Sequence, residues 1–243
     1  MKSFIVNIIC CFIPYRKTRH KLRHMVCKNT YKINGTNNKI YIGKTLYKSP
    51  IPGLTIEING NNNNIYIPTT YHFENCYFRI YANNSEIKIQ DTTKKIRNLV
   101  VNACCGENQK LYIGKNFHCH GVDIQLNEEN ASLYIGDDCL FSRLITIWPT
   151  DGHSIQDLKT NQVINNITRP VKIGNHCWVG ESVKILKNVE IGCDCVIGAG
   201  SVVSKKFSQN NIIIAGNPGK IIKQNITWDE ITAAIKTKTQ KND

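Results

Sequence analysis

A run of aliphatic residues spaced by six constrains the fold of this chain more than any other feature of its sequence. Six of them follow one another without a break: Ile173, Val179, Ile185, Ile191, Ile197 and Val203. Two positions before each stands a small or β-branched residue: Val171, Cys177, Val183, Val189, Cys195 and Ser201. An α-helix repeats every 3.6 residues and a strand every two, so neither explains this period. A triangular coil does, because each of its three short strands points one aliphatic side chain inward.

A second phrase, aliphatic-x-aliphatic-Gly, extends the pattern towards the N-terminus. It occurs at residues 40–43, 111–114, 133–136, 171–174 and 189–192. The last two copies are separated by three hexapeptides, and the earlier copies are spaced more widely. The earlier coils are therefore wider or carry short asparagine-rich loops such as residues 60–64. Glycine eases the corner of a coil because it has no Cβ. We therefore predict one β-helix domain over residues 31–224.

The rhythm of six fails after Ile147. Ile135, Phe141 and Ile147 step by six, but the interval from Ile147 to the next inward position, Ile173, is not a multiple of six. Residues 148–170 are therefore predicted to loop out of the coil. Loops on a rigid scaffold commonly hold functional residues. This loop contains His153, the histidine that we single out as a candidate for catalysis.

The end of the chain is predicted to leave the coils and form a helix. Residues 212–214 close the last coil, and residues 215–218, Ala-Gly-Asn-Pro, turn the chain away. Thr227 and Glu230 then have the spacing of a capping box, with Ile226 and Ile231 placed as the hydrophobic staple. We predict a C-terminal α-helix over residues 225–243.

The net charge of +13 is concentrated near the N-terminus. Residues 1–56 hold eleven Lys or Arg residues and no acid before Glu57, so the remaining residues are nearly neutral. An apolar stretch followed by basic residues predicts peripheral contact of residues 4–24 with an anionic membrane surface. The alternative for this N-terminal segment, residues 1–30, is a basic, poorly ordered leader. The apolar stretch is too short to span a bilayer.

Two further classes of partner are disfavoured by the sequence. No helix-turn-helix, zinc-finger or aromatic RNA-binding motif accompanies the positive charge, so we expect no nucleic-acid partner. The eleven cysteines are scattered, without a Cys-x-x-Cys pair suited to zinc. We interpret them as reduced thiols of a cytoplasmic protein, located at most peripherally at the inner face of the cytoplasmic membrane, and we expect no metal.

Four motifs in fixed order resemble one known family. They are Asp151-Gly152-His153-Ser154-Ile155, His176-Cys177-Trp178-Val179-Gly180, Ile197-Gly198-Ala199-Gly200-Ser201-Val202-Val203 and Ala215-Gly216-Asn217-Pro218-Gly219-Lys220. Together they look like the hexapeptide-repeat acetyltransferases, most of all the bacterial O-acetyltransferases of capsular and other surface polysaccharides. The resemblance covers about residues 130–228. It implies an all-β, left-handed parallel β-helix, an acetyl-CoA cosubstrate, a sugar or polysaccharide acceptor, and a homotrimer with active sites between subunits. The basic N-terminus fits an acidic glycan as the acceptor.

The resemblance also implies roles for individual residues. His153 would be the general base, since a sugar hydroxyl must lose its proton during attack and imidazole titrates near neutrality. No acyl-enzyme is needed, so no cysteine is a nucleophile by default. Asp151 or Asp157 could orient His153, and Glu181 lies near the expected cofactor groove. The residues expected to contact acetyl-CoA are Trp178, Gly180, Ala199, Ser204, Lys205, Pro218 and Lys220.

Each role has a structural alternative, and other functions stay open. Gly180 and Ala199 would suit tight corners in an inert prism, and Trp178 could pack between protomers. The acceptor could be a sugar amine, serine or an antibiotic. A γ-type carbonic anhydrase shares the fold, and His118 and His120 raise that possibility, but no further pair has the required spacing. A prism that serves only as a scaffold is the non-enzymatic alternative.

Overall fold

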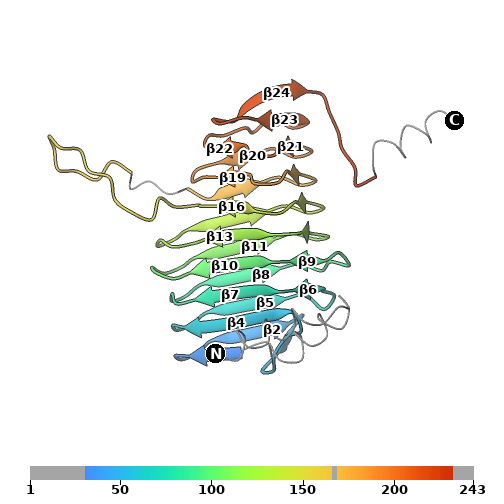
Figure 1. Cartoon of the computed structure of the whole chain (residues 1–243). Helices are drawn as coiled ribbons and strands as arrows, with labels where there is room; N and C mark the ends of the chain where they lie inside the picture. Colours follow the sequence, from blue (N-terminus) through green and yellow to red (C-terminus); the bar gives the residue numbers. More distant parts are fainter. Residues whose placement is uncertain (1–30, 166–168, 232–243) are drawn as a thin grey trace, which may run out of the picture.

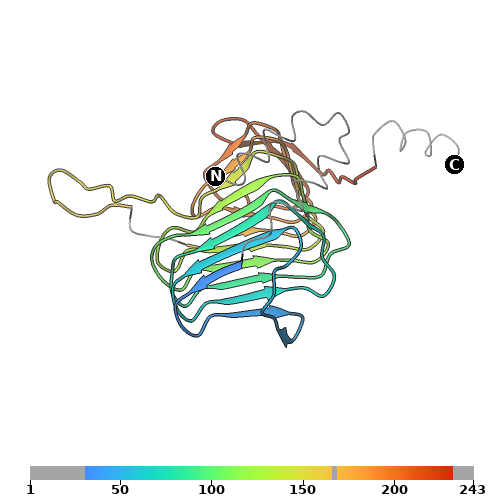
Figure 2. The ribbon, with the colours of Figure 1, turned by 60° about the horizontal axis from the view of Figure 1, so that its bottom comes forward.

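The structure is a computed structural model that describes residues 31–165 and 169–231 (Figure 1). Short strands wind around one axis as a three-sided prism, and Figure 2 shows the three sides with the axis tilted towards the viewer. We call the three sheets A, B and C.

Each sheet stacks parallel strands from successive coils. Sheet A contains β1 (Tyr31–Asn34), β4 (Leu54–Asn59), β7 (Cys76–Ile80), β10 (Leu99–Ala103), β13 (Val122–Gln125), β16 (Ile145–Ile147), β19 (Lys184–Ile185) and β22 (Val202–Val203). Sheet B contains β3 (Thr45–Leu46), β2 (Lys39–Ile42), β5 (Asn64–Ile67), β8 (Glu86–Ile89), β11 (Lys110–Ile113), β14 (Ser132–Ile135), β17 (Val171–Ile173) and β20 (Glu190–Ile191). Sheet C contains β6 (Phe73–Glu74), β9 (Ile96–Arg97), β12 (His118–Cys119), β15 (Leu140–Phe141), β18 (Trp178–Val179), β21 (Val196–Ile197), β23 (Ile212–Ala215) and β24 (Lys220–Gln224). Strands β3 and β24 are added antiparallel at the edges of sheets B and C.

The register of the strands confirms that the coils have different lengths. In the early coils Lys39 pairs with Asn64 and Leu54 with Cys76, so each of these turns is longer than three hexapeptides. In the last coils Lys184 pairs with Val202, a step of three hexapeptides. Between these two regimes Thr146 pairs with Lys184, the longest step of the prism, because residues 148–170 leave the coil there.

The predicted core positions are all buried. The six aliphatics from Ile173 to Val203 are at most 3% exposed, and the residue two positions before each of them is 0% exposed. The hexapeptide therefore points two side chains of every short strand inward, and stacking the coils joins them into one continuous apolar core. Earlier coils fill their greater width with larger side chains, such as Phe78, Phe117 and Phe141.

Asparagine is frequent because the corners need left-handed backbone. At the corner between sheets A and B, successive coils place Asn62, Asn84, Asn108 and Asn130 at φ between 56° and 60°. Asparagine tolerates this region better than most residues with a Cβ. The side chains also bond up the stack: Asn62 Nδ2 donates to Asn84 Oδ1 over 3.1 Å.

The C-terminal end differs from the prediction. After β23 the chain turns through Gly216 and the cis Asn217-Pro218 bond and returns as β24, which runs antiparallel to β23. The predicted helix does not begin at residue 225. Residues 225–231 instead form an extended strap along the corner between sheets B and C, because Ile226 N–H donates to the Asn211 carbonyl and Trp228 bonds to the same corner. Residues 232–243 lie outside the described residues.

The predicted N-terminal segment, residues 1–30, also lies outside the described residues, and with it the proposed membrane contact of residues 4–24. Over the part of the chain that is described, no helix has the length and apolar character needed to cross a bilayer.

Candidate functional site

The loop between β16 and β17 projects far from the prism (Figure 1). A bridge between Gln156 and Val163 makes its outer part a hairpin. Asp157 stabilises the tip by accepting hydrogen bonds from the backbone N–H groups of Lys159 (2.9 Å) and Thr160 (2.8 Å). His153 lies near the root of the loop and is exposed, and its imidazole makes no hydrogen bond with any described residue.

Asn165 ties the two branches of this loop together beside His153. Its Oδ1 accepts a hydrogen bond from the Ile155 N–H (2.8 Å). Its Nδ2 donates to Asp151 Oδ2 (2.8 Å) and to the backbone carbonyl of His153 (2.9 Å). The whole side-chain amide is therefore used to hold the segment that bears His153.

Lys187, in the corner that follows β19, anchors the loop to the prism. Its Nζ forms an ion pair with Asp151 Oδ2 and donates to the Asn165 carbonyl (3.0 Å). Burial raises the pKa of Asp151, but hydrogen bonds from Lys187 and Asn165 outweigh it and hold the pKa below its ordinary value. Asp151 and Asp157 thus have other partners than the His153 imidazole. We call Asp151, Asn165 and Lys187 the brace.

Gly152, between Asp151 and His153, is held by the preceding coil of the prism. Glu128 Oε1 accepts the N–H of Gly152 over 2.9 Å. Gly152 has a φ of +73°, where a residue with a Cβ would be strained. Asp151, Gly152 and His153 are therefore each held by at least one polar contact, in a loop that buries little apolar surface.

Five of the seven residues predicted to bind acetyl-CoA fall on two different corners of the prism, and the other two lie on strands of sheet C. Gly180 and Ala199 stack at the corner between sheets C and A, and the turn at Pro218 lies over the same corner, where Gly219 N–H donates to the Val202 carbonyl (2.8 Å). A Cβ on Gly180 would lie 2.7 Å from the Ala199 nitrogen, so close stacking of the coils by itself requires glycine there. Ala199 and Pro218 are exposed.

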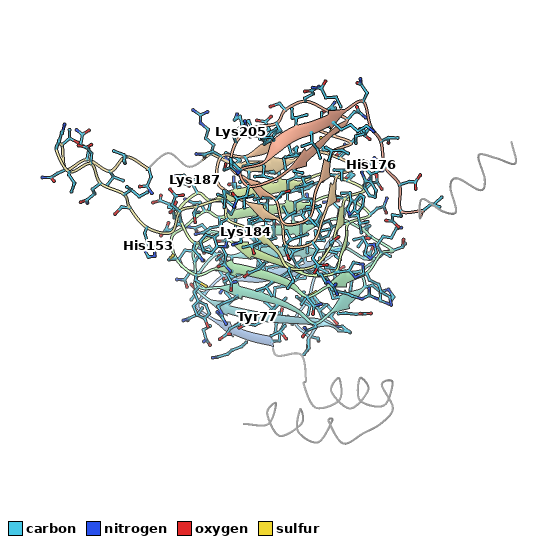
Figure 3. All side chains as sticks on the ribbon, turned by 45° about the horizontal axis from the view of Figure 1, so that its top comes forward. Tyr77, His153, His176, Lys184, Lys187 and Lys205 are labelled. Atoms are coloured by element: carbon cyan, nitrogen blue, oxygen red, sulfur yellow. The ribbon has the colours of Figure 1, made fainter. Side chains whose placement is uncertain are left out.

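Ser204 and Lys205 lie at the other corner, between sheets A and B. They follow β22 and come one coil after Lys187, so they share this corner with the loop root. Lys205 Nζ lies 5.4 Å from the centroid of the Phe207 ring. Figure 3 shows His153, Lys184, Lys187 and Lys205 on one side of the prism and His176 on the other. Lys220, at the start of β24, is exposed.

Trp178 does not join the His153 side within one protomer. It lies on sheet C with 40% of its surface exposed and packs against Trp228 of the strap, with ring centroids 6.0 Å apart. Trp228 stacks on His176 at 4.5 Å and donates its Nε1–H to the His176 carbonyl (2.8 Å). The sequence did not predict this aromatic cluster, because the capping-box pattern favoured a helix over the strap.

Two other residues raised by the sequence have their own partners. Glu181 forms an ion pair with Arg143 at 2.9 Å, so its charge is balanced beside the corner that holds Gly180. His120 Nδ1 lies 3.2 Å from the guanidinium of Arg97, a cation that opposes a divalent metal beside His118 and His120. Among the described residues, no three His, Cys, Asp or Glu side chains gather as a metal ion would require.

Comparison with known proteins places these features in a wider group. Residues 170–205 match the family model described as bacterial transferase hexapeptide (six repeats). The polysialic acid O-acetyltransferase of Escherichia coli O1:K1 / APEC is 31% identical over 122 residues, 50% of this chain and 39% of that protein. The galactoside O-acetyltransferase of Escherichia coli strain K12 is 33% identical over 115 residues, 47% of this chain and 54% of that protein. The chain spans about half the length of the curated relatives it matches.

A solved structure extends the likeness to most of the chain. The polySia specific acetyltransferase NeuO has a TM-score of 0.63 and 25% identity, covering 87% of this chain and 97% of that one. This likeness confirms the predicted fold class, an all-β left-handed parallel β-helix with an ejected loop. Residues 170–205 thus resemble the hexapeptide repeats of bacterial transferases, and they are carried on a β-helix of the same fold as an acetyltransferase.

Proposed function

We propose that the protein is an acetyl-CoA-dependent O-acetyltransferase that acetylates a sugar hydroxyl of a capsular or other surface polysaccharide, with His153 as general base. The main support is the loop itself. Residues 148–170 leave the coils, and this ejected segment presents an exposed imidazole on a stretch where three consecutive residues, Asp151, Gly152 and His153, each make a polar contact. Such a group is accessible to a large acceptor, and the backbone that carries it is held in place, which favours a general base.

The proposed reaction needs no covalent enzyme intermediate. The neutral imidazole of His153 takes the proton of the sugar hydroxyl while the hydroxyl oxygen attacks the thioester carbonyl carbon. The tetrahedral intermediate then collapses, the carbon–sulfur bond breaks, and the leaving thiolate takes the proton back from the imidazolium. The products are an acetyl ester and coenzyme A, and the histidine returns to its starting state.

Acetyl-CoA would bind as a substrate at the corners of the prism. Lys205 and Lys220 are exposed cations that suit its phosphates. Ala199 and Pro218 form an exposed corner with little side-chain bulk, along which a pantetheine arm would fit. Trp178 presents an exposed indole that would wall the acetyl or sugar site.

The separation of these residues supports a homotrimer with shared active sites. In one prism, the loop root with Ser204 and Lys205 lies at one edge of sheet A, and Gly180, Ala199 and Pro218 lie at the other edge. A loop that projects away from its own prism reaches a neighbouring subunit more readily than the far corner of its own. The site would then be completed between two protomers.

An acidic glycan fits the charge beside the loop. Lys184 points outward from β19, one strand away from the loop root, and its ammonium group has no partner among the described residues. Lys205 adds a second exposed cation on the same side (Figure 3). A carboxylate on the acceptor sugar would pair with such groups.

The test is release of the coenzyme A thiol from acetyl-CoA, measured with polysialic acid, neutral galactosides and a panel of capsular oligosaccharides. We expect turnover with one class of glycan and a loss of at least about 100-fold in kcat for His153→Ala, in line with general-base catalysis. His72→Ala, which removes another exposed histidine, should behave as wild type. Equal turnover by wild type and His153→Ala would refute the role of His153.

A further inference from the structure

We infer that Asn165 is a positioning residue for His153, acting with Asp151 and Lys187 as one hydrogen-bonded unit. The inference rests on the proposed function for its catalytic consequence, but the unit itself is a property of the loop. Nothing in the hexapeptide pattern requires it, because Asn165 lies outside the coils.

The contacts of Asn165 are matched donor to acceptor. Oδ1 accepts from Ile155 N–H at 2.8 Å, and the two Nδ2 hydrogens have two acceptors, Asp151 Oδ2 at 2.8 Å and the His153 carbonyl at 2.9 Å. Its own backbone carbonyl accepts from Lys187 Nζ at 3.0 Å. An amide is the one side-chain group of this size that can donate twice and accept at the same time.

The position of these contacts gives them their function. Asn165 contacts the Asp151 side chain, the His153 carbonyl and the Ile155 N–H. It therefore holds the chain on both sides of the residue that bears the imidazole. Loop residues 152–156 are exposed and gain no rigidity from apolar packing. The backbone that carries the imidazole is therefore positioned by polar contacts, and Lys187 connects them to the rigid prism.

Replacement of Asn165 by aspartate separates this role from simple space filling. Asp is nearly isosteric with Asn, so a packing role predicts little change. In the brace, Asn165→Asp turns both donated hydrogen bonds into repulsions, one between two carboxylates and one between a carboxylate and the His153 carbonyl. Since a shift of about 1 Å at a reacting group can reduce turnover about 100-fold, we expect a loss of that order in kcat.

The matched control is Gln162→Glu. It makes the same amide-to-carboxylate change on the same loop, at an exposed side chain that makes no hydrogen bond or ion pair with a described residue. We expect its kcat and thermal midpoint to equal those of wild type. Asn165→Asp should keep the KM for acetyl-CoA within about twofold, because the residues proposed to bind acetyl-CoA lie on the prism.

The swap variant Asp151→Asn with Asn165→Asp tests the unit directly. It moves the carboxylate across the pair, and Lys187 Nζ contacts both residues, through the Asp151 carboxylate and the Asn165 backbone carbonyl. We expect it to recover about tenfold of the kcat lost in Asn165→Asp, as coupled neighbours do. If the loss of kcat in the swap variant equals the product of the losses in the two single variants, the two residues are not a coupled pair.

Hydrogen exchange of the full chain provides a readout that does not depend on activity. In wild type the Ile155 N–H should be protected, and in Asn165→Ala, which removes the acceptor of that N–H, its exchange should accelerate at least about tenfold, while exchange of the core strands stays unchanged. Unchanged exchange at Ile155, or Asn165→Asp turnover equal to that of Gln162→Glu, would overturn the inference. A wild type without turnover on any glycan, but with the expected exchange, would instead count against the proposed function alone.

Discussion

Gly174 offers a direct test of how tightly the coils stack. It is the glycine of an aliphatic-x-aliphatic-Gly phrase at the corner between sheets B and C. A Cβ built on Gly174 would lie 2.6 Å from the carbonyl carbon of Gly192 and 2.7 Å from the Cys193 nitrogen, which are backbone atoms of the next coil. Carbon atoms pack at about 3.5–4.0 Å, so Gly174→Ala forces two backbones apart by roughly 1 Å.

The expected magnitude follows from two opposing effects. Overpacking in a well-packed region costs about 1–3 kcal/mol. The lower entropy of the unfolded chain returns about 0.4–1 kcal/mol on replacing glycine by alanine. We expect a net loss of about 1–2 kcal/mol, and at about 2–4 °C per kcal/mol for a domain of this size the thermal midpoint should fall by roughly 2–8 °C.

The assay is thermal unfolding followed by circular dichroism, with Gly121→Ala as matched control. A Cβ on Gly121 would meet its closest neighbour, the Leu144 nitrogen, at 3.4 Å, which is an ordinary contact. Gly121→Ala should therefore unfold at or above the wild-type temperature. If both variants unfold together, the spacing between coils is not what requires glycine at Gly174.

Three further predictions concern the site and the core. Lys205→Ala should raise the KM for acetyl-CoA severalfold with little change in kcat, measured by initial rates, since it would remove a contact made equally to ground and transition states. Because the folded pKa of Asp151 lies below its ordinary value, the brace should be intact at a pH above that ordinary value and should be lost as the pH falls through the folded pKa. Hydrogen exchange at the Ile155 N–H should accelerate with this loss in wild type. The same acid transition should be absent in Lys187→Met. Burial raises the pKa of the Cys76 thiol to about 11, so iodoacetamide under mildly alkaline conditions should label the exposed Cys105 long before Cys76, as read by peptide mass spectrometry.

The interior of the fold was predictable from sequence because its signal is local and periodic. The positions of Ile173 and Ile197 repeat a pattern that each coil must satisfy for itself, and all such positions are buried. The same logic located the loop, since an inserted segment shifts the register of every later position. The backbone conformation at the corners was harder to predict. The left-handed conformation of Asn62 and Asn130 is reflected in the sequence only by the general abundance of asparagine.

The contacts that shape the site were not predictable from sequence, because they join residues without a fixed spacing. Asn165 bonds to Ile155, His153 and Asp151 at three different separations along the loop, and Lys187 reaches back to Asp151 across its base. The strap was assigned to a helix because Thr227 and Glu230 have capping-box spacing. In the structure Glu230 pairs with Lys94 at 2.7 Å instead, and a tertiary ion pair of this kind leaves no trace in local sequence.

The reversal of β24 bears on whether the protein can polymerise. A stack of parallel coils has no intrinsic length, and its last coil exposes unpaired N–H and C=O groups that could receive the first coil of another molecule. β24 occupies that position on sheet C and runs antiparallel, so a parallel coil arriving there meets the wrong hydrogen-bond pattern. On sheet B the last strand β20 already pairs with Phe207, and on sheet A Val202 of β22 is bonded to Gly216 and Gly219, which leaves little edge to extend. The top of the prism is thereby a terminus for growth, and end-to-end fibres are disfavoured there.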